Sequence, residues 1–186
     1  MLVKISVASV LVLGALAGYI ASRPSDFRIS RSRTIAAPPD IVHAYVNDLH
    51  KWREWSPWET LDPALKREYS GAPAGPGAMY SWWGNRHVGE GRMTITDSRA
   101  PQSITIRLEF FKPWRGTNTA QFDFGPSGSG TNVTWTMTGR SNFMAKAFGL
   151  FMDMDTMIGS YFEKGLAKLD ASTTAAVASR SGGDRS

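Results

Sequence analysis

Residues 47–59 of the chain read NDLHKWREWSPWE and place Trp52, Trp55 and Trp58 at three-residue spacing. Tryptophan is the largest side chain to bury, and its indole N–H needs a hydrogen-bond partner in the interior. Three such side chains within seven residues therefore predict an organised apolar wall. That wall is either part of a solid core or the lining of a cavity.

The residues around this stretch predict a mainly β domain with an early helical insert. Residues 27–35 form a first strand, Pro39 and Asp40 open a short helix over 40–46, and Asn47 or Asp48 caps a second one that runs through Trp55. Further strand-like runs, separated by Gly, Pro and Asn, cover residues 65–70, 78–84, 88–97, 102–111, 116–124 and 131–139. Apolar and polar residues alternate most clearly over 104–110, 121–124 and 133–138, which is typical of an antiparallel meander with one apolar and one solvated face.

After Gly139 the apolar period changes from two to three and four residues. This pattern predicts a long amphipathic helix over residues 142–169, about 40 Å long, with a bend near Gly149. Residues 171–186 contain Ser, Thr, Ala and Gly without an apolar period, so we expect a disordered tail.

The first 22 residues differ in kind from the rest, because Ile5 to Ile20 carries no charge. As a helix, residues 2–22 would be about 30 Å long, which predicts a transmembrane anchor. The alternative is a signal peptide cleaved near Ala15-Leu16-Ala17 and an exported protein. The basic residues that follow the run, Arg23, Arg28, Arg31 and Arg33, place the globular part of a single-pass protein in the cytoplasm.

The net charge of +5 does not lie on the predicted domain, because residues 34–170 carry 14 basic and 14 acidic side chains. A nucleic-acid-binding face needs its positive charge on the folded domain, so nucleic acid is not an expected partner. The chain has no cysteine, which excludes disulfides and thiolate metal sites.

Several segments in this order resemble the START-like, or SRPBCC, superfamily, and specifically its polyketide cyclase/dehydrase and lipid transport branch. They are IAAPPDIV at 35–42, NDLHKWREWSPWE at 47–59, YSGAPAGPGAMYSWWGN at 69–85, VGEGRMTI at 88–95 and GTNVTWTMTG at 130–139. The resemblance implies an α+β helix-grip domain over residues 27–170. In that fold a curved antiparallel sheet of about seven strands wraps around a long C-terminal helix, with two short helices after the first strand. Known ligands of the family are apolar molecules held between the sheet and the last helix.

A cavity of this kind needs missing volume on the inner face of the sheet, and Gly89 and Gly91 share the inward phase of one strand with Met93. The alternative is that these glycines allow a bulge or a close contact. Unbranched methionines such as Met154 adapt to irregular ligands, although methionine at helical spacing is also common in cores. Of Trp82 and Trp83, the resemblance favours Trp82 as the inward one. The predicted lining residues are Trp52, Trp55, Trp58, Tyr80, Trp82, Gly89, Gly91, Met93, Trp135, Met137, Phe151, Met154 and Ile158.

Residues for catalysis or metal binding are sparse. The three histidines, His43, His50 and His87, are scattered and show no zinc-ligand spacing, so we interpret them as surface residues. Asp48 is better explained as a helix cap. The sequence therefore predicts no catalytic residue, no metal and no cofactor.

Three functions remain. The first is a membrane-anchored domain that binds a small hydrophobic ligand, lipid-like or polyketide-like. The second is a polyketide cyclase/dehydrase-like enzyme, in which Tyr80 and Asn85 are the residues to test. The third is a protein-interaction module at the membrane, which predicts an exposed apolar patch. The sequence does not predict an oligomeric state.

Overall fold

The computed structural model describes residues 2–183, and residues 11–179 with their side chains. Its centre is an antiparallel sheet of seven strands in the order β1-β7-β6-β5-β4-β3-β2. Neighbouring strands from β2 to β7 are also consecutive in the sequence, so they form the predicted meander. The strands are β1 (Asp26–Ile35), β2 (Lys66–Gly71), β3 (Ala78–Trp83), β4 (Glu90–Arg99), β5 (Ser103–Lys112), β6 (Gly116–Ser127) and β7 (Gly130–Arg140).

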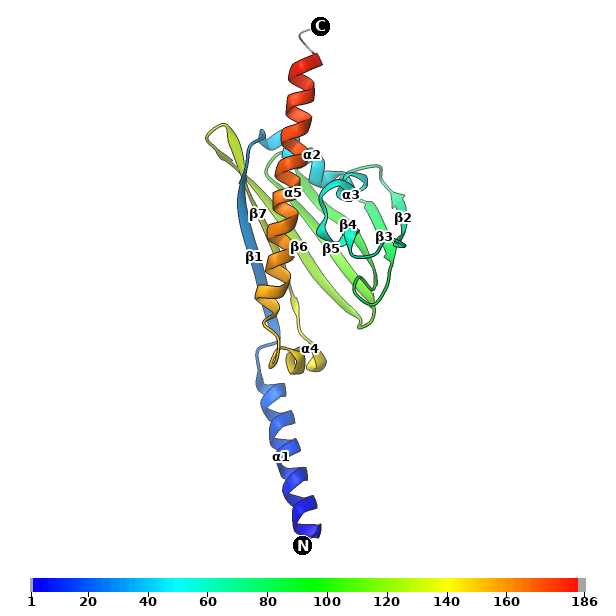
Figure 1. Cartoon of the computed structure of the whole chain (residues 1–186), viewed down its shortest axis with the longest axis vertical. Coiled ribbons are helices and arrows are strands. Elements are labelled where there is room, and N and C mark those ends of the chain that lie inside the picture. The colour runs from blue at the N-terminus through cyan, green and yellow to red at the C-terminus, as the bar shows by residue number, and fades with distance from the viewer. Residues whose placement is uncertain (1, 184–186) are drawn as a thin grey trace.

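Helices occupy three places around this sheet (Figure 1). Near one end lie α2 (Pro39–Asn47), the 3-10 turn η1 (Leu49–Lys51), α3 (Trp52–Trp55) and the 3-10 turn η2 (Pro57–Thr60). The short α4 (Phe143–Phe148) leads into α5 (Met154–Gly183), which runs along β1 across the sheet. The first helix, α1 (Leu2–Ser22), extends away from the sheet and meets the rest of the molecule beside α4. These elements confirm the predicted helix-grip α+β fold.

The C-terminal helical region is interrupted and longer than predicted. Gly149 ends α4, and Asp153 caps the new helix by accepting a hydrogen bond from the Thr156 N–H at 3.2 Å. The predicted disordered tail is instead part of α5 up to Gly183, and residues 184–186 lie outside the described residues. The helix continues because Thr173 is buried, donates a hydroxyl hydrogen bond to the Leu169 carbonyl at 2.8 Å, and is followed by Val177, which packs against the core.

The predicted transmembrane segment is corrected by the structure. Within residues 11–179, whose side chains the structure describes, no helix is long and apolar enough to cross a membrane. The predicted single-pass location, with the globular part in the cytoplasm, is therefore wrong. Residues 1–10 of the predicted anchor lie outside the described side chains.

Two of the arginines that we interpreted as a membrane-topology signal have structural partners in α5. Arg31 and Arg33 lie on the inner face of β1, in register with Trp135 and Val133 of β7. Arg31 forms ion pairs with Asp155 at 2.8 Å and with Glu163 at 3.0 Å, and Arg33 pairs with Asp170 at 3.3 Å. These pairs attach the helix to the edge strand.

The strand register arranges the side chains of the inner face in rows that cross the sheet. The row next to α2 and α3 contains Ile104, Phe122, Trp135 and Arg31. The second contains Ile95, Ile106, Ala120, Met137 and Ile29. The third contains Tyr80, Met93, Leu108, Asn118, Gly139 and Phe27. The fourth, near the β5–β6 turn, contains Trp82, Gly91, Phe110 and Gly116. We call the end of the sheet that carries the third and fourth rows the open end.

Candidate functional site

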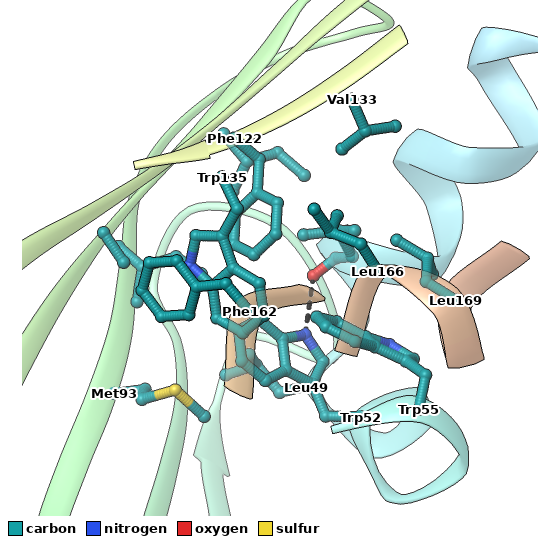
Figure 2. Close-up of a cluster of buried hydrophobic side chains, with 14 of the residues drawn as sticks. Leu49, Trp52, Trp55, Met93, Phe122, Val133, Trp135, Phe162, Leu166 and Leu169 are labelled. Carbon is teal, nitrogen blue, oxygen red and sulfur yellow. Dashed lines mark hydrogen bonds between the residues drawn. The ribbon is translucent and has the colours of Figure 1, made fainter. Parts of the chain in front are cut away.

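Trp52 and Trp55 belong to a solid aromatic cluster between the sheet and α5 (Figure 2). At its centre the Trp135 ring stacks on Phe162 of α5, with centroids 4.2 Å apart and planes 6° apart. Phe122 stacks on Trp135 at 4.8 Å, and Trp55 meets the same ring edge-on at 5.7 Å. Because Trp135 is only 3% exposed and Trp55 is completely buried, this part of the predicted cavity wall is core.

Backbone contacts hold this cluster in place. The Trp52 indole N–H donates to the Val46 carbonyl at 3.0 Å, the dashed line in Figure 2. Pro57 and Trp135 both lie against Gly165 of α5, where an added Cβ would stand 2.9 Å from the Trp135 ring. The glycine thus lets α5 approach the tryptophan-rich segment closely. Trp58 is half-buried and stacks on Tyr161 of α5 at 5.7 Å.

Two indole N–H groups in the cluster have no hydrogen-bond partner in the described part of the protein. They are Nε1 of Trp55 and Nε1 of Trp135, and both atoms are buried. A buried donor without a partner costs about 1–3 kcal/mol. The free energy gained by packing the rings therefore outweighs the cost of leaving these two N–H groups without hydrogen bonds.

The two glycines that we expected to leave empty volume do not leave it. At Gly91 an added Cβ would stand 2.4 Å from Cζ2 of Trp82 and 2.4 Å from the Glu109 carbonyl oxygen, so the tryptophan already fills the space. Gly89 has a φ of +70° and lies against the Lys112 carbonyl, which identifies it as a turn residue at the start of β4. The alternative reading of close contact is the correct one here. Trp82 is the inward residue of its pair, as predicted, because Trp83 is exposed.

The open end of the inner face is less completely covered. Met93 is buried there and Met137 is buried in the adjoining second row, but Leu108 and Phe110 are only half-buried. Near the start of α5, residues 149–155 line an open hollow of about 510 Å³. Of the predicted lining residues, Ile158 packs against the core, Met154 is exposed, and Phe151 is 87% exposed. Phe151 and Met154 therefore line a surface hollow and not a closed cavity, and Ile158 does not line that hollow.

A buried polar cluster at the β2–β3 edge was not predicted from the sequence. The Tyr80 hydroxyl donates to Glu59 at 2.7 Å, and Arg67 forms an ion pair with the other carboxylate oxygen of Glu59 at 2.6 Å. Burial and the Glu59 hydrogen bond raise the pKa of Tyr80 well above its usual range. Glu59 and Arg67 are eight residues apart in different elements, so no sequence pattern could have indicated the cluster.

Two of the histidines lie next to polar side chains of the protein. His50 is exposed, and its Nδ1 lies 3.1 Å from Oδ1 of Asp48, whose carboxylate also caps η1 as predicted. His43 is buried, contrary to our expectation, and its Nε2 lies 3.2 Å from the Ser98 hydroxyl. Burial lowers the pKa of His43. Within the described residues no group of three or more His, Cys, Asp or Glu side chains is arranged to hold a metal ion.

Solved structures of known proteins share this fold at low sequence identity. The Mll3558 protein of Rhizobium loti is 21% identical, covers 77% of this chain and 96% of its own, and superposes with a TM-score of 0.54. The major latex-like protein 151 of Panax ginseng is 12% identical, covers 80% and 98% of the two chains, and gives a TM-score of 0.58. The Aha1 protein of Colwellia psychrerythraea, solved as a dimer, is 15% identical, covers 77% and 93%, and gives a TM-score of 0.56. These likenesses show the fold alone.

No curated protein is similar enough to the chain to count as a match. The family model for polyketide cyclase / dehydrase and lipid transport, in contrast, matches residues 26–173, which include the whole sheet and the part of α5 that covers it. The match confirms the resemblance carried by the tryptophan-rich segment and the strands that follow it. The chain therefore belongs to the polyketide cyclase / dehydrase and lipid transport family of helix-grip proteins.

Proposed function

We propose that this protein binds a small hydrophobic ligand, lipid-like or polyketide-like, between the open end of the sheet and the start of α5. Members of its family commonly bind hydrophobic ligands. Of the predicted lining residues, Met93 lies at this end and Met137 in the adjoining row, and Leu108 and Phe110 lie beside them on the inner face. The aromatic cluster then serves as the rigid end wall of the site.

The observation that carries the proposal is the change in packing along the inner face. Trp135 in the first row is buried against Phe162, whereas Leu108 in the third row and Phe110 in the fourth remain half-buried. A fully packed core would cover these apolar side chains, because each gains about 1.5–3 kcal/mol on burial. Their partial exposure supports an additional apolar molecule as the missing cover.

The segment that leads into α5 is rich in exposed, adaptable side chains. Phe151, Met152, Met154 and Met157 are all exposed, although large apolar residues usually lie inside. Unbranched methionine side chains can repack around ligands of different shapes. Contiguous exposed apolar residues next to a hollow are typical of a binding surface.

Uptake of a fluorescent fatty acid by the full chain tests the proposal. We expect 11-(dansylamino)undecanoic acid to bind saturably and to raise the unfolding temperature. Replacing half-buried Leu108 by Gln should weaken binding about tenfold, since it removes roughly 1–2 kcal/mol of apolar contact. The matched control is Thr119→Gln, an exposed position on β6 in register with Arg107 of β5. A wild-type protein that neither binds the probe nor gains stability from it would contradict the proposal.

The enzyme alternative receives no support from its two candidate residues. The Tyr80 hydroxyl is committed to Glu59, and Asn85 accepts a hydrogen bond from the His87 N–H at 2.8 Å. Neither residue lines the hollow of residues 149–155, so neither side chain is placed to act there as a free acid or base.

A protein-interaction module remains a second candidate because of α4. Its side chains Phe143, Met144 and Phe148 are exposed, and the Phe148 ring lies 5.3 Å from that of exposed Trp114. Photo-crosslinking from position 144 in the full chain tests this alternative. A specific crosslinked partner that is lost in Phe148→Ser, with probe uptake unchanged, would favour the interaction module.

A further inference from the structure

We propose that Asn118 determines the ligand specificity of this site by donating a hydrogen bond from its amide nitrogen to a carbonyl oxygen of the bound molecule. The inference rests on the proposed function and adds the chemical class of the ligand. That class is an apolar molecule with a ketone or similar carbonyl group, as opposed to a pure hydrocarbon.

Asn118 is a polar residue in an otherwise apolar part of the inner face. It lies in the third row of the sheet, between Leu108 of β5 and Gly139 of β7. Beyond Leu108 the row continues with Met93, and the preceding inward position on β7 is Met137. The amide is therefore surrounded by the same side chains that form the proposed binding surface.

Most of the hydrogen-bonding capacity of this amide is unused. A carboxamide offers two N–H donors and a carbonyl oxygen with two lone pairs. Within the described part of the chain, the side chain of Asn118 makes one contact of this kind, from Nδ2 to the Met137 sulfur at 3.8 Å. A thioether is a weak acceptor, so the second N–H of Asn118 is available to a ligand.

Gly139 holds the amide in this orientation. A Cβ added to Gly139 would stand 2.1 Å from Oδ1 of Asn118, so the carboxamide lies directly over the glycine. Any other residue at position 139 would displace it. The oxygen is thus directed toward β7, which leaves the amide nitrogen near Met137.

Charged residues on the same face provide a contrast. Arg31 is paired with Asp155 and Glu163, and Arg33 with Asp170, so the strong polar groups along β1 are satisfied by α5. Asn118 lies two strands away from β1 and has no such partner among the described residues. An apolar ligand lying over Leu108 would leave the amide without water, and a carbonyl oxygen on that ligand would restore the hydrogen bond.

A pair of ligands that differ only in an oxygen tests the inference. We would titrate the full chain with 2-acetylnaphthalene and with 2-ethylnaphthalene by calorimetry. We expect the ketone to bind about five- to tenfold more tightly, as for one hydrogen bond in a partly buried site. In Asn118→Leu, which has nearly the same size, we expect this preference to disappear while 2-ethylnaphthalene binds at least as well as before.

The matched control is Asn132→Leu, the same replacement at an exposed position of β7, and it should retain the preference of the wild type. If Asn118→Leu does not fold, the wild-type protein still gives an answer through the side-chain amide signals of Asn118 in a 1H–15N spectrum. The ketone should shift them strongly and 2-ethylnaphthalene weakly. A preference that persists in Asn118→Leu, or amide signals that respond equally to both ligands, would overturn the inference and leave the proposed function intact. Failure of the wild type to bind either compound would instead count against the proposed function itself.

Discussion

Trp82 lies so close to Gly91 that a Cβ atom added to the glycine would stand 2.4 Å from the indole Cζ2 atom. The two residues face each other across β3 and β4 in the fourth row of the sheet. This contact decides a question that the sequence left open, because the space beside the glycine is occupied by the protein itself. We therefore expect the proposed ligand to lie against Leu108 and Phe110 and not in a recess at Gly91.

Replacing Gly91 by Ala should destabilise the fold by about 1–3 kcal/mol, the usual cost of overpacking. The new methyl group would collide with the Trp82 ring and with the Glu109 carbonyl oxygen, which belongs to the backbone and cannot move aside easily. Urea denaturation measures the change. Gly116→Ala is the control, because Gly116 lies in the same row and has nothing within 4 Å of an added Cβ. Equal stability of the two variants would contradict the packing described.

Arg31→Gln should loosen the start of α5. The guanidinium donates to the Asp155 carboxylate and to its backbone carbonyl at 3.1 Å, and it lies over Gly159. Without it, amide hydrogen exchange over residues 155–163 should become several-fold faster. Local opening of the helix would then cost less free energy, because these bonds would no longer have to be broken. Mass spectrometry of the exchanging full chain measures this effect.

Arg33→Gln provides the comparison for Arg31, because it removes a similar ion pair from the same face of the same strand. Its partner is Asp170, so faster exchange should appear around that residue and not at the start of α5. Gly159→Ala should reproduce the Arg31→Gln result, because its Cβ would displace the guanidinium. Unchanged exchange of residues 155–163 in Arg31→Gln would show that the Arg31 ion pairs do not stabilise the start of α5 against local opening.

Glu59→Gln should lower the free energy of unfolding by about 1–3 kcal/mol, because the substitution leaves buried hydrogen-bonding groups without a charged partner. Both Arg67 and Tyr80 bond to this carboxylate, whose side chain is 8% exposed. The control is Glu90→Gln, which removes the exposed ion pair with Lys112 and should change stability by no more than about 0.5 kcal/mol. Chemical denaturation of the three proteins distinguishes the two positions. If Glu59→Gln lowered the free energy of unfolding as little as Glu90→Gln does, the Glu59 cluster would not contribute to stability as proposed.

The stability of the protein should fall as the pH drops below about 6.5, in part because of His43. Burial lowers the pKa of this imidazole from 6.5, while a hydrogen bond with the Ser103 backbone acts in the opposite direction. The folded state therefore binds the proton less readily than the unfolded state, and acid favours unfolding. The groups that face the ring are the Ser98 hydroxyl, which also donates to Asn47, and the ring of Phe124.

An NMR titration of the full chain gives the direct measurement for His43, with an expected midpoint below 6.5. In His43→Gln the loss of stability between pH 7.5 and pH 5 should be smaller than in the wild type. His87→Gln, at an exposed position, should behave like the wild type. A His43 midpoint at or above 6.5 would contradict the prediction.

Several of these features were beyond sequence reasoning for identifiable reasons. The ion pair between Glu59 and Arg67 joins a 3-10 turn to a strand, and side-chain partners across such a distance leave no periodic signal. Burial of His43 depends on how α2 packs against the sheet. The helical continuation beyond Leu169 depends on Thr173 and Val177 meeting the core, although their neighbours have the composition of a disordered tail.

The sequence by itself determined the positions of the strands along the chain, the antiparallel meander and the family, whereas the pairing of β1 with β7 came from the structure. Alternation of side chains and the spacing of turn residues are local properties that the backbone enforces wherever they occur. It also identified Trp52, Trp55 and Trp58 as an apolar wall. Only the tertiary structure decided that this wall is solid, that Trp82 fills the space at Gly91, and that Asn118 keeps an unused N–H at the open end. Whether volume is filled or empty depends on which side chains from distant segments meet, and that is a property of packing and not of any one segment.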